Sequence, residues 1–164
     1  MERVARRDVG KMITRVKGFT LIELLVTLAV ATVLATVAVP GFQSMMARNQ
    51  LASDFNEILS GLNYARSEAI KRRDLVEFSV DDGGPGWSYS VSLSNEDLLR
   101  QRQAGNNRVS ATERILVFDR LGRIDGGGCD AGACDIEVSR GELCRVITIN
   151  NFGRSGRGDN ECQE

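Results

Sequence analysis

Hydrophobic residues follow three successive patterns along this chain. Residues 19–39 form an unbroken apolar run of 21 residues, in which Glu23 is the one charged residue, and Pro40 follows it. A helix of that length is about 30 Å long, which matches the hydrocarbon core of a bilayer. The run therefore predicts a membrane-spanning helix over residues 19–40.

After Pro40 the apolar run gives way to a helical stripe. Apolar residues recur at alternating steps of four and three, at positions 51, 55, 58, 62, 65 and 69. This spacing is typical of one face of a helix, and polar residues such as Asp54 and Glu57 occupy the other face. The pattern predicts an amphipathic helix over residues 41–73 that continues into a globular head.

From Leu75 onward the period falls to two, which is typical of strands. Alternating apolar residues predict strands at 76–80, 87–93, 115–118, 136–139 and 143–150, and the polar stretch 94–113 predicts an exposed, mobile connection. One long helix followed by short antiparallel strands predicts an α+β fold. We expect the helix to pack on an antiparallel sheet or sandwich that forms the head, residues 74–164.

The apolar run has two simpler interpretations. It fits a cleavable secretory signal that ends at Ala29-Val30-Ala31, or a plain membrane anchor. A carboxylate inside a membrane segment is costly, however, and marks a functional residue by default. Neither interpretation accounts for Glu23 or for the sharp boundary at Gly18-Phe19.

The segment Lys-Gly-Phe-Thr-Leu-Ile-Glu, residues 17–23, resembles the processing site of type IV prepilins and pseudopilins. The resemblance implies that a prepilin peptidase removes the leader, residues 1–18, by cutting between Gly18 and Phe19, and then methylates the new amino terminus. It also implies that Glu23 pairs with the free amino group of a neighbouring subunit when the chain assembles with other pilins. Two opposite charges buried in lipid or in a helical bundle offset one another's desolvation only when they meet.

Charge is unevenly distributed along the chain. Six of the 21 basic residues and two of the 22 acidic residues precede Phe19, so 15 basic and 20 acidic residues follow. A positive flank predicts a cytoplasmic amino terminus, a single pass through the bacterial inner membrane and a periplasmic head, which later enters a pilus or pseudopilus. The acidic body argues against a globally basic nucleic-acid-binding protein.

The chain lacks histidine, and so lacks the commonest general base and metal ligand. Its glycine run, residues 126–128, is not followed by the Gly-Lys-Ser/Thr of a nucleotide-binding loop. We therefore expect no catalytic residues, no metal and no cofactor. The sequence indicates a structural protein rather than an enzyme.

Four cysteines, Cys129, Cys134, Cys144 and Cys162, lie on the exported side of the predicted membrane helix. An even number in an oxidising compartment predicts two disulfides, for which three connectivities are open. We favour Cys129 with Cys134 and Cys144 with Cys162. A four-cysteine zinc site is the alternative, but the spacing contains no Cys-x-x-Cys.

Two arginines set among glycines, Arg154 and Arg157, follow the last predicted strand. Glycine allows a ligand to approach the backbone closely, and a guanidinium binds phosphate through two donors at once. The alternative is a solvated turn.

Within the pilins, the strand-rich head, the Leu121-Gly122-Arg123 turn and the final strand before Gly153-Arg154 resemble the FimT/GspH family. In FimT-type minor pilins linked to natural transformation, a Gly-Arg-x-Arg element is associated with DNA capture; here the spacing is one residue longer. The resemblance implies a minor pilin that acts in pilus biogenesis and in binding and uptake of double-stranded DNA through Arg154 and Arg157. The other assignment within the family is a GspH-type pseudopilin of type II protein secretion.

Overall fold

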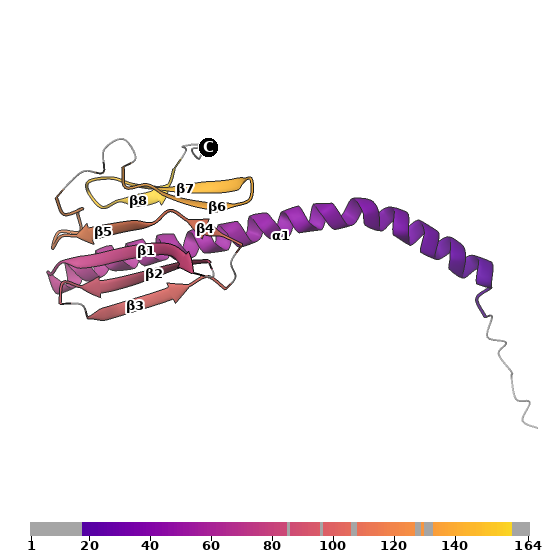
Figure 1. Ribbon diagram of the computed structural model, residues 1–164, viewed down its shortest axis with the longest axis horizontal. Helices are drawn as coiled ribbons and strands as arrows, with labels where there is room; N and C mark the ends of the chain where they lie inside the picture. The colour runs from indigo at the N-terminus through magenta and orange to yellow at the C-terminus, as the bar shows by residue number, and fades with distance from the viewer. Residues whose placement is uncertain are drawn as a thin grey trace, which may run out of the picture. The chain divides into compact units, whose positions relative to one another are not determined.

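A computed structural model of the chain describes residues 18–84, 86–95, 97–105, 108–126, 129 and 133–158. Residues 1–17 of the predicted leader, and Cys162, lie outside this part of the chain. The helix and strands, in chain order, are α1 (Leu21–Arg72), β1 (Val76–Gly84), β2 (Gly86–Leu93), β3 (Leu98–Gln103), β4 (Ser110–Ala111), β5 (Arg114–Phe118), β6 (Ile136–Arg140), β7 (Leu143–Ile149) and β8 (Ser155–Arg157) (Figure 1). One long helix followed by antiparallel strands confirms the predicted α+β fold.

The chain divides into two compact units after Gly41. In the first unit every described residue is exposed, and its part of α1 contains Pro40. By length and composition alone, α1 is apolar enough near its amino end to cross a membrane.

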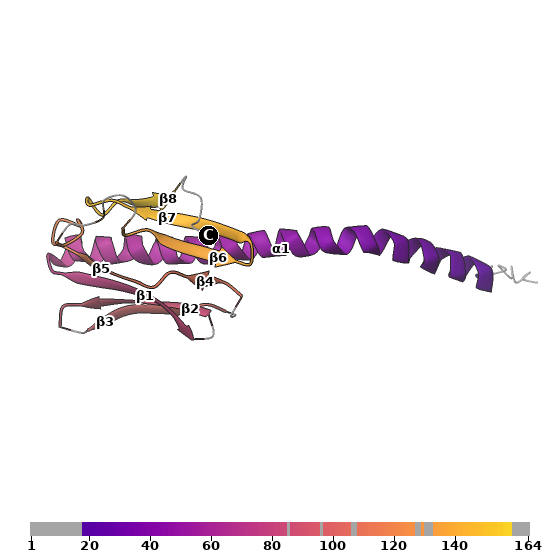
Figure 2. The same ribbon diagram turned by 45° about the horizontal axis from the view of Figure 1, so that its top comes forward.

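The second unit, from Phe42 onward, contains two four-stranded antiparallel sheets. Sheet A has the strand order β3-β2-β1-β5, and sheet B has the order β4-β6-β7-β8. Figure 2 shows the part of α1 in this unit between the strands of sheet A and strands β7 and β8. The register pairs Phe78 of β1 with Val91 of β2 and Leu116 of β5, so buried side chains line one face of sheet A.

The predicted helical stripe forms the centre of this unit's core. All six stripe positions, residues 51, 55, 58, 62, 65 and 69, are buried. At Gly61 the helix approaches sheet A so closely that a Cβ atom there would lie 2.7 Å from the Tyr89 ring. A side chain at this position would overpack the interface between α1 and sheet A.

The predicted mobile connection over residues 94–113 was wrong, because β3 and β4 lie within it. The charged strand β3 is an exposed sheet edge that packs through its arginines and through Leu99, which lies against the core. Arg100 and Arg102 lie 3.4 and 3.5 Å from the Glu57 carboxylate of α1, which also accepts a 3.1 Å hydrogen bond from the Tyr89 hydroxyl. Hydrophobic periodicity does not detect a strand held in this way.

Candidate functional site

The predicted processing and assembly residues lie at the start of α1. Gly18, Phe19 and Thr20 precede the helix, and the Thr20 hydroxyl accepts a 3.2 Å hydrogen bond from the Glu23 backbone amide. Thr20 thus acts as the helix N-cap, and Glu23 places its negative charge in the first turn, where the helix dipole favours it. The Thr-x-x-Glu spacing was a capping signal in the sequence, and our sequence analysis missed it.

A second feature missed in the sequence is a turn that occurs twice in the head. In the first turn, residues 119–123, the Asp119 carboxylate accepts hydrogen bonds from the backbone amides of Leu121, at 2.9 Å, and Arg123, at 2.8 Å. The Gly122 amide donates to the Asp119 carbonyl at 2.8 Å, and the Asp119 amide donates to the Arg123 carbonyl at 2.7 Å. This turn follows β5.

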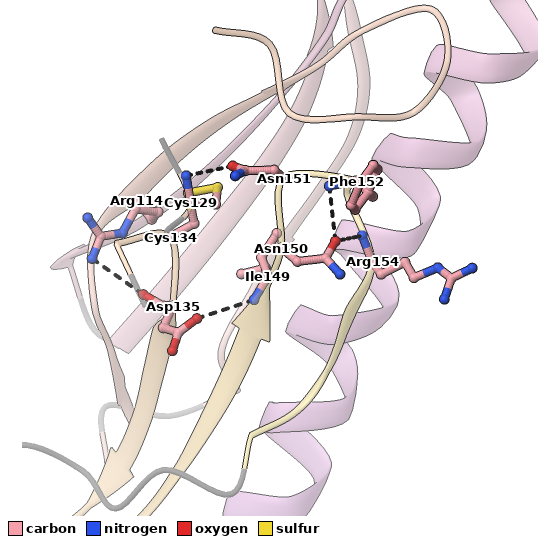
Figure 3. Close-up of a disulfide and its surroundings, with 9 residues drawn as sticks. All are labelled: Arg114, Cys129, Cys134, Asp135, Ile149, Asn150, Asn151, Phe152 and Arg154. Carbon is pink, nitrogen blue, oxygen red and sulfur yellow. Dashed lines mark hydrogen bonds between the residues drawn. A yellow bond between two sulfur atoms is a disulfide. The ribbon is translucent and has the colours of Figure 1, made fainter. Parts of the chain in front are cut away.

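The second turn, residues 150–154, follows β7 and has the same four hydrogen bonds. The Asn150 side-chain oxygen accepts from the amides of Phe152, at 3.1 Å, and Arg154, at 3.0 Å (Figure 3). The Gly153 amide donates to the Asn150 carbonyl at 2.8 Å, and the Asn150 amide donates to the Arg154 carbonyl at 3.1 Å. The pattern Asp/Asn-x-apolar-Gly-Arg at these two places was the signal in the sequence.

Arg66 of α1 holds the two turns together. Its Nε donates to the Gly122 carbonyl at 2.9 Å, and its Nη2 donates to the Phe152 carbonyl at 3.2 Å. Gly122 and Gly153 both have positive φ, 72° and 68°, and a Cβ atom at Gly153 would collide with the Gly122 carbonyl oxygen. Only glycine meets both requirements at these positions.

The disulfide region braces the second turn from the other side. The structure contains the Cys129–Cys134 bond, in agreement with the favoured pairing, and the Cys129 amide donates to the Asn151 side chain at 2.8 Å (Figure 3). Cys144 is also disulfide-bonded. Its predicted partner, Cys162, lies outside the described residues, so the second pairing stays a prediction.

The structure separates the two predicted DNA-binding arginines. Arg157 lies in β8 opposite Ile147, on the face from which Ser155 reaches Asn63 of α1. Arg154 lies outside β8, in the second turn, where its backbone amide donates to the Asn150 side chain. Both side chains are exposed, and neither forms a hydrogen bond or ion pair with the described residues.

The two turns differ in charge. In the first turn the Arg123 guanidinium lies 3.1 Å from the Asp119 carboxylate, whereas Arg154 faces a turn whose equivalent residue is the neutral Asn150. Burial acts to raise the pKa of Asp119, but the hydrogen bonds from the Arg123 and Leu121 amides and from the Arg123 guanidinium outweigh it and hold this pKa below its ordinary value. The charge of Arg123 is therefore neutralised within the first turn, whereas the charge of Arg154 is not neutralised within the second turn.

Arg154 also lines a polar pocket of about 390 Å³, together with Asp135, Asn150 and Ser155. Among the residues that the structure describes, no group of three or more Cys, Asp or Glu side chains is placed to hold a metal ion. The arrangement offers charge and hydrogen bonds at a surface.

Comparison with known proteins agrees with this architecture. The model of the family described as type II transport protein GspH matches residues 54–153, and that of the prokaryotic N-terminal methylation motif matches residues 13–39. The chain is a type IV minor pilin or pseudopilin of the GspH family. The methylation-motif match covers the predicted processing site of this pilin.

Relatives and solved structures support the same assignment. A fimbrial protein of Pseudomonas aeruginosa is 35% identical over 76% of this chain and 79% of its own length, and fimbrial protein Q of Moraxella bovis is 38% identical over 76% and 69%. The crystal structure of the Pseudomonas aeruginosa type IV minor pilin FimU matches with a TM-score of 0.55 at 22% identity, covering 68% of this chain and 90% of that one. FimU thus shares the fold of this pilin.

We expect Asp119→Asn to lower the stability of the head at neutral pH and to remove part of its acid sensitivity. Because the pKa of Asp119 is lower in the folded state, the carboxylate contributes stability above its unfolded pKa of about 4. That contribution is lost as the pH falls through the folded-state pKa. Urea unfolding at pH 7 and pH 3 should show a wild-type advantage that shrinks at pH 3.

The matched control is Asp125→Asn, since Asp125 is exposed and its side chain forms no hydrogen bond or ion pair with the described residues. It should leave the unfolding midpoint unchanged at both pH values. An Asp119→Asn effect of equal size at pH 7 and pH 3 would contradict the charge-based account of the first turn.

Proposed function

We propose that this chain is a minor subunit of a type IV pilus. In this proposal the chain is cut after Gly18, held in the inner membrane with its head in the periplasm, and then drawn into the filament. The observation that carries it is the first part of α1: every described residue from 18 to 46 is exposed, and most of these residues are apolar. Such a surface requires lipid or neighbouring helices around it.

Glu23 gives this surface its specificity. It is the one charged residue between Phe19 and Val39, so its desolvation in a membrane or bundle must be offset by an opposite charge. Cleavage after Gly18 creates that charge, because the new amino terminus at Phe19 is a cation. If the Glu23 carboxylate of one subunit pairs with the amino terminus of a neighbouring subunit, that pairing fixes how far the two helices are shifted along the filament axis.

Pilus assembly is favoured over type II secretion by the relatives, which are fimbrial proteins, and by the minor pilin with the same fold. The family model bears the name of a type II transport protein, which supports the alternative of a GspH-type pseudopilin. The two assignments differ in where the processed chain accumulates: in sheared surface pili, or in the envelope with an effect on secretion.

We expect Glu23→Leu to abolish incorporation into pili while leaving processing and membrane insertion intact. The leucine keeps the helix apolar but leaves the amino terminus of the neighbour without a partner. Immunoblots of sheared pili and of membranes, with the mass of the membrane form, separate these steps.

Two controls accompany this experiment. Thr27→Val, one turn further along α1, should enter pili normally, and Gly18→Lys should retain the leader and stay in the membrane. Normal incorporation of the Glu23→Leu protein would contradict the proposed role of Glu23.

A second proposed activity, of the FimT type, is DNA binding by the head. It is supported by the exposure of Arg154 and Arg157 and by their lack of partners among the described residues. Arg157 lies in β8, the edge strand of sheet B, and Arg154 lies in the turn before it, so the two side chains would bind phosphates at the edge of this sheet. Asp135, which lines the pocket beside Arg154, opposes an anion there.

A gel-shift titration of double-stranded DNA with the head, residues 47–164, tests this activity. This segment contains every buried core side chain among the described residues. Two phosphate contacts predict that affinity falls about tenfold between 50 and 200 mM salt. The double change Arg154→Ala and Arg157→Ala should abolish the shift. Arg108→Ala, at a position distant in sequence from both arginines, should leave the shift in place. DNA binding that survives the double change would overturn this assignment.

A further inference from the structure

The two repeated turns expose apolar side chains on a rigid scaffold. Leu121 is 65% exposed and Phe152 is 67% exposed. Each of the two turns is nevertheless fixed by four internal hydrogen bonds of its own and by a hydrogen bond from Arg66. Ile70 of α1, 47% exposed, lies against Gly122 beside them. Large apolar side chains held together in solvent indicate a surface that another molecule covers.

The second turn adds a free cation to this surface. Arg154 has no partner among the described residues, whereas Arg123 in the equivalent position is paired with Asp119. An aromatic ring beside an arginine is the combination that dominates the binding energy of protein interfaces. We call Phe152 and Arg154 the plug.

A complementary site lies on the outer face of sheet A. A pocket of about 660 Å³ is lined by four apolar residues, three serines and two acidic residues: Leu75, Leu93, Leu98 and Val117, Ser90, Ser92 and Ser94, and Glu77 and Asp125. Neither carboxylate forms an ion pair or hydrogen bond with the described residues. We call this pocket the socket.

The socket opens on the face of sheet A away from α1. Val76 and Phe78 of β1 are fully buried on the face of sheet A that packs against α1, so Glu77 between them belongs to the opposite face. The plug, in contrast, is attached to α1 through the hydrogen bond from Arg66 to the Phe152 carbonyl. Glu77 and the helix that holds the plug therefore lie on opposite sides of sheet A.

We propose that the plug of one copy of this chain enters the socket of a second copy. The Phe152 ring would fill the apolar part of the pocket, and the Arg154 guanidinium would lie between the carboxylates of Glu77 and Asp125. An aromatic ring with one cation thus meets a partly apolar pocket with two anions. Because each copy carries both halves, the contact is head-to-tail and can repeat from subunit to subunit.

This contact rests on the proposed role as a filament subunit. One ring and one arginine bury far less than the roughly 1,200 Å² of a stable interface, so the contact is weak between free heads. Anchoring the copies in one membrane raises their effective concentration and makes a weak contact sufficient. On this account Arg154 can contact DNA only in a copy whose plug is not inserted into the socket of another copy.

Site-specific cross-linking of the full-length processed chain in neutral lipid vesicles tests the proposal. A benzophenone amino acid replaces Phe152, and copies carrying it are mixed with ¹⁵N-labelled copies that lack it. Mass spectrometry should place the cross-links on Leu93, Leu98 or Val117 of the labelled copy. The same probe at Arg157, which is equally accessible on β8, should give no socket cross-links.

Charge reversal supplies the second arm of the test. Arg154→Glu should reduce the cross-link yield at least fivefold, and the pair Glu77→Lys and Asp125→Lys should do the same. A mixture of the two variants should restore cross-links between unlike copies only. Arg157→Glu, which changes the net charge equally, should leave the yield unchanged.

Three results would overturn the proposal: cross-links that fall outside the socket, yields that ignore the charge reversals, or no recovery in the mixture. Circular dichroism of each variant checks that the head is folded; if a reversal unfolds it, Arg154→Gln and Glu77→Gln replace it with the same expected direction. The Glu23→Leu experiment reports on pilus incorporation separately. A chain that enters pili without the socket cross-link would therefore exclude this contact and leave the filament role intact.

Discussion

A single guanidinium on α1, that of Arg66, connects three segments of the head that are far apart in the sequence. It donates hydrogen bonds to the carbonyls of Gly122 and Phe152, which lie 56 and 86 residues further along the chain. The two repeated turns lie so close together that a Cβ atom at Gly153 would collide with the Gly122 carbonyl oxygen. Removing the arginine would leave two carbonyl groups without a partner, at a cost of about 1–3 kcal/mol for each one that stays buried. The geometry of the exposed surface at this end of the head follows from that one contact.

The functional features of this pilin divide between its two units. In the first unit, an apolar helix with one carboxylate suits a membrane and a filament but identifies no partner. In the second unit, Arg66 fixes two turns that have the same hydrogen-bond pattern. The first turn has Asp119 where the second has Asn150, so Arg123 is paired with a carboxylate and Arg154 is not. A neutral residue in the second turn leaves Arg154 available for an anion. The phosphates of DNA and the carboxylates of a neighbouring subunit are both suitable anions, and they compete for the same side chain.

Much of the fold could be predicted from local pattern, because α1 and the central strands bury one face each. The stripe from Leu51 to Ala69 and the alternation at Val76, Phe78 and Val80 are buried as their spacing indicates. Strand β3 was missed because Arg100 and Arg102 attach it to Glu57 by charge, and its sequence has no alternation of apolar and polar residues. The site was predicted only in part: Arg154 and Arg157 are exposed, but the loop composition concealed that Arg157 lies in strand β8 and Arg154 in the turn before it. The repeated turn was visible in the sequence as Asp/Asn-x-apolar-Gly-Arg, whereas its connection to Arg66 is a tertiary contact that no local pattern contains.

The central claim is that Arg66 preorganises the two turns as one rigid surface. Amide hydrogen exchange of the full-length chain, compared between wild type and Arg66→Met, tests it most directly. The amides of Leu121, Arg123, Phe152 and Arg154 should exchange at least about tenfold faster in the variant, because a loss of 1.4 kcal/mol in local stability corresponds to a factor of ten. The amides of β1 and β2 should keep their protection. Unchanged exchange in both turns, or an equal loss of protection throughout the head, would contradict this account.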